Sequence, residues 1–187
     1  MKYEKAYPIA RDMANQLAPY CERIEIAGGV RRKKAEPHDI ELVAIAKTEP
    51  IFDLFGHEIG ERNLLDEALE EMVAAGQMFK GRTQGPRFKQ FQVYGVALDL
   101  FVVKPPAQWG VIFAIRTGPA HYSHWLVTQR AKGGPLPDDA HVRDGAVWCG
   151  EDINDPLPMD TEESFFAFLD IPMPAPQDRI PAWGNKQ

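Results

Sequence analysis

The sequence predicts an α+β fold, because segments with the two-residue repeat of strands and segments with helical spacing both occur along it. The expected strands cover 23–27, 39–46, 77–81, 87–94 and 97–103, and the expected helices cover 3–20, 64–76, 107–116 and 119–132. Apolar residues make up 44% of the chain and charged residues 26%. This balance is ordinary for a globular protein and argues against wholesale disorder.

In the first half of the chain, cap and turn signals separate these elements. Met13 and Leu17 recur at helical spacing and give the first helix an apolar face. Helices commonly end at a glycine in the left-handed backbone conformation, so the helix over 64–76 is expected to end at Gly76. Tyr94-Gly95 suits a tight turn, which predicts that the last two strands of this half are joined as a hairpin.

Pro105-Pro106 breaks the chain and marks a candidate boundary between subdomains. We therefore expect one subdomain over 1–104 and a second over 105–187. In the second, Asp144-Gly145 predicts a hairpin over 141–149.

The end of the chain is expected to hold one more helix and an extended tail. Asp160 and Glu163 have the spacing of a capping box, which predicts the start of a helix, and Phe165 and Phe166 would belong to its apolar face. The Pro-rich segment from 172 is expected to pack along the surface in an extended form.

The net charge of −6 disfavours a simple nucleic-acid binder, because such proteins usually present a basic surface to the phosphates. The basic residues are nevertheless grouped. One group runs from Arg31 to Lys34, and a second consists of Lys80, Arg82, Arg87 and Lys89. A local positive surface can persist on a chain whose total charge is negative.

No apolar run approaches the length of a membrane span, and the start, MKYEKAYPIARDM, places charges where a signal peptide needs an apolar core. Cys21 and Cys149 match no Cys-x-x-Cys spacing and are expected to stay reduced. The sequence therefore predicts an intracellular, cytoplasmic protein without a membrane partner.

Three acidic residues lie in the expected strands. Asp39 and Glu41 are two apart, so a strand would direct both to one face, and Asp99 stands in the apolar segment VALDLFVV. Converging carboxylates repel each other unless they are protonated, paired or bridged by a cation, and Mg²⁺ prefers such oxygen ligands. For Asp39 and Glu41 alone, a solvated strand face is the alternative.

Gly28-Gly29 ends the strand over 23–27, ahead of Asp39. Glycines let backbone N–H groups approach a phosphate closely, and a nearby arginine can reinforce such an anion site. An ordinary turn is the alternative. Next to the acidic strand, the pair favours a phosphoryl-transfer layout, with phosphates on the glycine turn and metal ions on the carboxylates.

These motifs resemble those of the polymerase beta-like (family X) branch of the nucleotidyltransferase superfamily. The similarity runs in order through Gly28-Gly29-Val30-Arg31-Arg32, Asp39-Ile40-Glu41, Asp99, Trp109 to Phe113, Thr117-Gly118 and a closing helix followed by Pro176-x-x-Arg179. It implies a catalytic palm with a mixed β-sheet and flanking helices over 1–104, and a small C-terminal α/β nucleotide-binding subdomain over 105–187. The amino-terminal lyase domain and helix-hairpin-helix region of larger members have no counterpart.

The resemblance also implies roles for individual residues. Asp39, Glu41 and Asp99 would be catalytic and would bind two Mg²⁺ ions, for which Mn²⁺ can substitute. The implied nucleotide-binding residues are Gly28, Gly29, Arg32, Arg116, Thr117, Gly118 and Ser123. Weaker DNA contacts would come from Lys80, Arg82, Arg87 and Lys89.

Several positions depart from the family pattern. Gly29 replaces a serine that helps hold the triphosphate, and Glu41 replaces the second aspartate. Ile115-Arg116 replaces an aromatic pair that excludes a ribose 2′-hydroxyl, and Ser123 replaces an asparagine that contacts the base. These departures leave sugar selectivity and base fidelity open.

The implied activity is that of a small DNA polymerase, which transfers nucleotides from dNTPs, or NTPs, to a DNA 3′-hydroxyl with release of pyrophosphate. The biological process would be gap filling, repair or replication. The partners would be primed or gapped DNA and a second protein that aids DNA binding, and the chain would be a monomer. Reduced polymerases of this form exist among viruses, which is compatible with a virus or phage origin. Two alternatives stay open: nucleotidyl transfer to tRNA or a small molecule, and a catalytically silent module that binds nucleotide or DNA.

Overall fold

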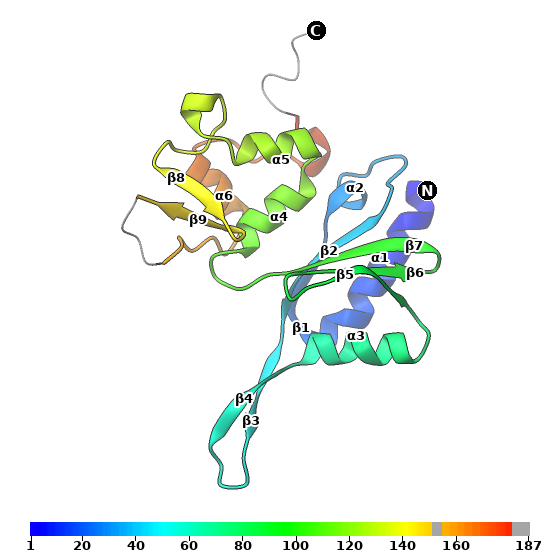
Figure 1. Cartoon of the computed structure of the whole chain (residues 1–187). Coiled ribbons are helices and arrows are strands. Elements are labelled where there is room, and N and C mark those ends of the chain that lie inside the picture. Colours follow the sequence, from blue (N-terminus) through cyan, green and yellow to red (C-terminus); the bar gives the residue numbers. More distant parts are fainter. Residues whose placement is uncertain (151–154, 181–187) are drawn as a thin grey trace.

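The computed structural model of the protein describes residues 1–150 and 155–180. Figure 1 shows one lobe built around a β-sheet and a second lobe that is mainly helical. The helices are α1 (Tyr3–Leu17), α2 (Gly28–Arg31), α3 (Leu64–Ala74), α4 (Trp109–Thr117), α5 (Ala120–Leu126) and α6 (Glu162–Leu169). The strands are β1 (Cys21–Ile26), β2 (Ile40–Ala46), β3 (Thr48–Phe52), β4 (Glu58–Asn63), β5 (Phe79–Gln84), β6 (Phe88–Val93), β7 (Val96–Val102), β8 (Ala140–Arg143) and β9 (Ala146–Cys149).

The central sheet has the strand order β1-β2-β7-β6-β5. It is mixed, because β2 and β7 are parallel while the other neighbouring strands are antiparallel. Tyr94 and Gly95 form the tight turn between β6 and β7 in left-handed conformations, with φ of 50° and 75°. The α+β class and this turn are therefore confirmed.

The two faces of the sheet differ because successive strand residues point to opposite sides. One face packs against α1 and α3 in a large apolar core that includes Leu42. The opposite face carries Glu41 and Asp99, both half-buried. Trp109 and Phe113 of α4 cover the apolar remainder of that face. The acidic side chains thus lie on the side of the sheet that the second lobe approaches.

The second lobe has its own apolar core. Val111, Tyr122, Val147 and Phe165 lie in it, contributed by α4, α5, β9 and α6. The β8–β9 hairpin turns at Asp144-Gly145, as predicted. Because α4 also packs on the sheet, it is one of the elements that join the two lobes.

The pair β3–β4 is an element that the sequence analysis did not predict. It follows β2 and precedes α3 along the chain, forms a separate two-stranded sheet and projects from the central sheet. Every residue of β3 is exposed. Because neither face is buried, the segment lacks the apolar–polar alternation by which a half-buried strand is recognised.

The predicted helix over 119–132 is wrong beyond Leu126, where α5 ends. The backbone then bonds to a later segment instead of continuing the helix, because Arg130 N donates to Leu136 O and Leu136 N donates to Thr128 O. Tertiary hydrogen bonds have overridden the local helical pattern.

Three further expectations need adjustment. Helix α6 begins one residue later than predicted, because the capping box is formed by Thr161 and Ser164 and not by Asp160 and Glu163. The tail expected to be extended from 172 contains a 3-10 turn at Pro176–Asp178 and is described only to residue 180. The strand expected over 77–81 runs over Phe79–Gln84.

Within the described residues, no helix is long and apolar enough to cross a membrane.

Replacing Gly110 with alanine is expected to destabilise the protein by about 1 to 3 kcal/mol in urea unfolding. The added Cβ would lie 2.0 Å from the backbone oxygen of Thr161, so α4 and α6 would have to separate. Gly60→Ala is the matched control, because a Cβ there would meet nothing within 4 Å. Equal effects at the two positions would contradict the close approach of α4 and α6.

Candidate active site

Three acidic residues lie near one another where β2 and β7 are neighbours in the sheet. Glu41 and Asp99 are direct partners in the parallel register, and Asp39 immediately precedes β2. All three are half-buried. Burial is the largest cause that raises the pKa of Glu41 and of Asp99, and the negative charge of Asp39 adds to both shifts. The structure therefore brings together the three acidic residues that the sequence singled out.

The negative charge of these carboxylates is only partly balanced by the positive charges around them. Burial, and next the charge of Asp39, raise the pKa of Glu41 to about 7, while Arg116 and Arg32 oppose this shift. Burial also raises the pKa of Asp99, although Gln90 donates a hydrogen bond of 3.1 Å to it. Uptake of a proton or a cation by this face is therefore favourable.

The donor chemistry of this face suits a hard divalent cation, which prefers carboxylate oxygens. In the described ranges 1–150 and 155–180, however, no three His, Cys, Asp or Glu side chains are gathered closely enough to hold one ion. Glu41 turns its Oε2 toward Gly28, and Asp99 Oδ1 accepts from Gln90. The residues thus fit Mg²⁺ by donor type, although the described side chains are not arranged as a closed set of ligands.

Gly28 begins α2 and is required there for two reasons. Its φ of +62° lies in the left-handed region, which side chains other than glycine rarely adopt. A Cβ at this position would also lie 1.8 Å from Glu41 Oε2. Gly28 and the following Gly29 are both buried, so the glycine turn lies directly against the acidic face.

The basic run from Arg31 to Lys34 is divided between two environments. Arg32 donates from Nη1 to the backbone oxygen of Thr117 at 2.6 Å. Burial lowers the pKa of Arg32, whereas the charges of Glu41 and Asp39 raise it. Lys33, with a φ of 55°, turns the chain, and both lysines are exposed. The arginines therefore face the interior, and the lysines face solvent.

Arg31 ties the two lobes together. It donates to both carboxylate oxygens of Glu162, at 3.0 and 2.8 Å, and to Thr117 Oγ1 at 2.6 Å. Arg179 donates to the same carboxylate at 2.6 Å. Burial opposes ionisation of Glu162, but the hydrogen bonds from these two arginines hold its pKa below the ordinary value. Glu162 is therefore a shared anion between α2, α6 and the C-terminal segment.

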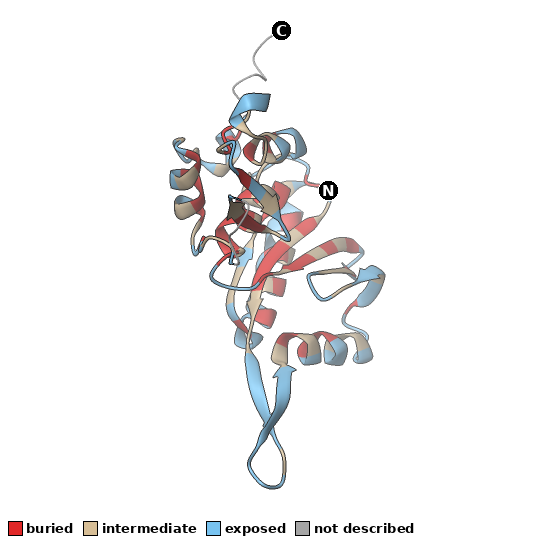
Figure 2. Ribbon diagram, turned by 60° about the vertical axis from the view of Figure 1, so that its left-hand side comes forward, coloured by how far each residue is buried: buried red, intermediate tan, exposed pale blue. Residues whose placement is uncertain are grey.

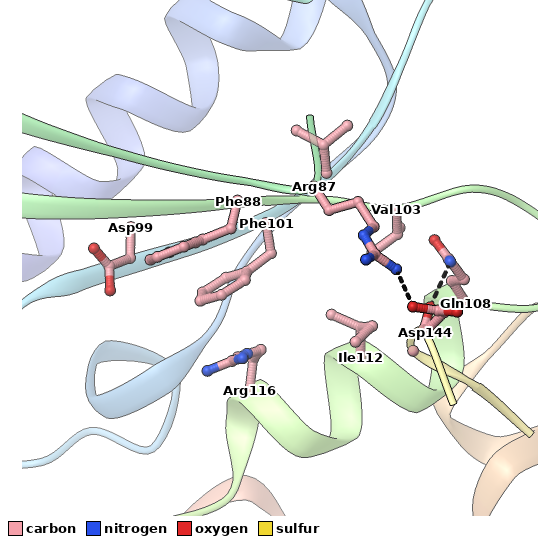
Figure 3. A pocket seen from close by; sticks show the side chains of 11 residues that line it. Arg87, Phe88, Asp99, Phe101, Val103, Gln108, Ile112, Arg116 and Asp144 are labelled. Carbon is pink, nitrogen blue, oxygen red and sulfur yellow. Dashed lines mark hydrogen bonds and ion pairs between the residues drawn. The ribbon is translucent and has the colours of Figure 1, made fainter. Parts of the chain in front are cut away.

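A pocket of about 390 Å³ opens beside Asp99, between the sheet, α4 and the β8–β9 turn (Figure 3). Its lining includes Arg87, Phe88, Phe101, Gln108, Ile112, Arg116 and Asp144. The Arg116 guanidinium lies 3.9 Å from the centre of the Phe101 ring, and its Nε is buried without a hydrogen-bond partner in the described part of the chain. Arg116 thus contributes a partly unsatisfied cation next to the acidic face.

The other residues expected to bind nucleotide on α4 and α5 are engaged within the protein. Thr117 is fully buried and bonded to both Arg31 and Arg32. The Ser123 hydroxyl donates to Ile115 O at 2.5 Å. Gly118 packs so closely against the ring of Tyr122 that a Cβ would lie 2.7 Å from it. Among these predicted residues, the side chain of Arg116 is the one that lines the pocket beside Asp99.

The structure does not gather the four expected DNA-binding residues into one patch. Lys80 pairs with Glu70 at 2.6 Å, Arg87 with Asp144 at 2.6 Å, and Lys89 with Asp66 at 3.3 Å. Glu70 and Asp66 belong to α3, which lies on the face of the sheet opposite Asp99. Arg82 is exposed and has no ion pair within the described residues.

Sequence reasoning missed two residues of the site. Gln90 faces Asp99 in the β6–β7 register, and counting back from the Tyr94-Gly95 turn would have found it. Glu162 lies 131 residues from Arg31, and no local pattern predicts that contact.

No protein-family model matches the chain, and a search of curated proteins found no relative. The chemistry of the site therefore follows from its own residues and their geometry.

Replacing Glu162 with glutamine is expected to lower the free energy of unfolding by about 3 to 5 kcal/mol, because Arg179 and much of Arg31 would lose their buried counter-charge. Urea unfolding would measure the change. Glu163→Gln is the matched control, since Glu163 is exposed on the same helix. Equal stability of the two variants would contradict the shared-anion interpretation.

The stability of the metal-free protein should depend on the ionisation of Glu41. An acid whose pKa is raised by folding holds its proton more tightly in the folded state, so its contribution to stability falls as the pH rises from about 4.5 to about 7. Glu41→Gln should remove this slope and make the protein more stable than wild type above pH 7, by on the order of 3 kcal/mol.

Urea unfolding of both proteins in EDTA, from pH 5 to pH 8, would measure this difference. Identical pH slopes would show that Glu41 ionises normally. If the face binds Mg²⁺, the ion should raise the melting temperature of the wild type more at pH 8 than at pH 5.5, because a cation would bind the ionised form of the carboxylate.

Proposed function

We propose that the chain is a polymerase beta-like nucleotidyltransferase that adds nucleotides to a DNA 3′-hydroxyl. In this proposal the sheet lobe is the palm and the lobe after Pro105 is the nucleotide-binding subdomain. The observation that carries it is the placement of Glu41 beside Asp99 on parallel strands, with Asp39 in electrostatic contact and the Gly28 turn against Glu41.

Asp39, Glu41 and Asp99 would hold the divalent ions, Mg²⁺ or Mn²⁺. Bound there, such ions would supply Lewis-acid stabilisation of the charge that develops during phosphoryl transfer. Asp99 would accept the proton of the 3′-hydroxyl as the general base. Gln90, through its hydrogen bond to Asp99 Oδ1, would orient that carboxylate.

The backbone at Gly28 and Gly29 would bind the triphosphate together with Arg32. Arg32 donates a hydrogen bond from Nη1 to Thr117 O, and its other N–H groups make no hydrogen bond within the described part of the chain. A guanidinium with free donors suits phosphate oxygens, because its planar N–H groups match their geometry. Arg116 would lie near the sugar and base, because its side chain lines the pocket beside Asp99.

Two observations favour a second candidate, transfer to a small-molecule acceptor. Lys80, Arg87 and Lys89 are each paired with an acidic side chain, and the chain carries a net charge of −6. A long DNA duplex would then find few free cations, which weakens its binding. Product analysis with and without template, on primer, tRNA and small hydroxyl acceptors, distinguishes the two candidates.

Purified protein with Mg²⁺ or Mn²⁺, dNTPs and a labelled gapped primer-template is expected to extend the primer. Asp99→Asn keeps the size of the side chain but removes the proton acceptor and a metal ligand, so it should lower the extension rate about a hundredfold or more. Asp160→Asn, at an exposed position near the start of α6, is the matched control.

Extension that survives Asp99→Asn would refute the site assignment. Nucleotide binding without any Mg²⁺-dependent turnover on any acceptor would favour a catalytically silent binding module.

A further inference from the structure

The β3–β4 hairpin concentrates large apolar side chains at an exposed position. These are Ile51, Phe52, Leu54, Phe55 and Ile59, and Leu54 and Phe55 at the tip are 100% and 85% exposed. Figure 2 shows the hairpin exposed along its length and projecting from the sheet. Single exposed apolar residues are common, but a group of them on one projecting element is typical of an interaction site.

The tip is held in a defined shape. The Asp53 carboxylate accepts hydrogen bonds from the backbone N–H groups of His57 and Phe55, at 2.9 and 2.8 Å. These bonds lower the pKa of Asp53. Backbone bonds from Asp53 N to His57 O and from Gly56 N to Asp53 O close the turn. A tip ordered before binding loses little conformational entropy when it docks.

The charge of the hairpin restricts what it can bind. Residues 48–63 contain four acidic residues and one basic residue, a net charge of −3. This charge repels nucleic-acid phosphates and anionic lipid headgroups. It also disfavours pairing of two hairpins from two copies of the chain, since their charges would add. The complementary surface is apolar at its centre and basic at its rim.

We propose that the hairpin is a docking element that inserts Leu54 and Phe55 into an apolar groove of a protein partner whose rim carries lysine or arginine. In Figure 1 the hairpin projects from the side of the sheet lobe away from α2 and α4, so the partner would leave the acidic face accessible. Buried aliphatic and aromatic anchors surrounded by charged contacts are the usual source of affinity in such interfaces. The proposal does not depend on the proposed function.

The test begins with photo-crosslinking. The full chain, carrying p-benzoylphenylalanine in place of Phe55, is produced in the cells that encode it and irradiated. The same amino acid in place of Phe79 is the control, because Phe79 is 67% exposed on β5, outside the hairpin. We expect a protein adduct specific to position 55.

The crosslinked protein is then purified and titrated with the unmodified chain. Leu54→Ser combined with Phe55→Ser should weaken binding about tenfold or more, and Phe79→Ser should leave it unchanged. Both altered side chains of the double variant are exposed, so its melting temperature should match that of the wild type. Glu58→Lys, which reverses one hairpin charge, should also weaken binding, and added salt should weaken binding of the wild type.

Four outcomes would overturn the proposal. The first is the absence of an adduct specific to position 55, and the second is a partner whose affinity the double serine variant leaves intact. The third is adducts between copies of the chain, with a dimer in sedimentation velocity that the double serine variant abolishes. The fourth is a loss of affinity for DNA, or for vesicles of anionic lipid, in that variant.

Discussion

The carboxylate of Glu162 holds the two lobes in register, because it accepts hydrogen bonds from arginines of different parts of the chain. Arg31 comes from α2, next to the acidic face, and Arg179 comes from the C-terminal segment. Glu162 and Arg179 are almost completely buried, so each charge is tolerable only while the other is in place. The same arrangement sets the end of α4 over the sheet, since Arg31 also binds Thr117.

That position of α4 determines the electrostatics of the acidic face. Three carboxylates face two arginines, Arg32 and Arg116, and burial adds to the cost of their negative charge. The arginines do not restore balance, since the pKa of Glu41 still rises to about 7. A bound cation would remove the remaining repulsion and allow Glu41 to ionise. The electrostatic strain in the free protein therefore comes from the same burial and repulsion that would favour the proposed binding of a cation.

The sequence predicted much of this face, because its signals are local. The two-residue spacing of Asp39 and Glu41 and the apolar segment around Asp99 singled out these three residues, and the Tyr94-Gly95 turn indicated that β6 and β7 pair as a hairpin. These patterns depend on residues close together in the chain, which is why they can be read without a structure.

The parts that could not be predicted depend on distant contacts or on the absence of burial. Glu162 reaches Arg31 across 131 residues, and nothing near either residue indicates the pairing. Helix α5 ends early because the backbone around Arg130 bonds to Leu136. The β3–β4 hairpin has no buried face, so its strands lack the alternation that identified β2.

The division of the basic run follows from the shortness of α2. Successive residues of a helix point about 100° apart, so Arg31 and Arg32 diverge within one turn, one to Glu162 and the other toward Thr117 O and the acidic face. Lys33 then takes a left-handed conformation that ends the helix and returns the chain toward β2. A longer helix would carry the chain away from Asp39. The left-handed start at Gly28 and the left-handed end at Lys33 therefore leave Arg31 on Glu162 and Arg32 near the acidic face, with both lysines exposed to solvent.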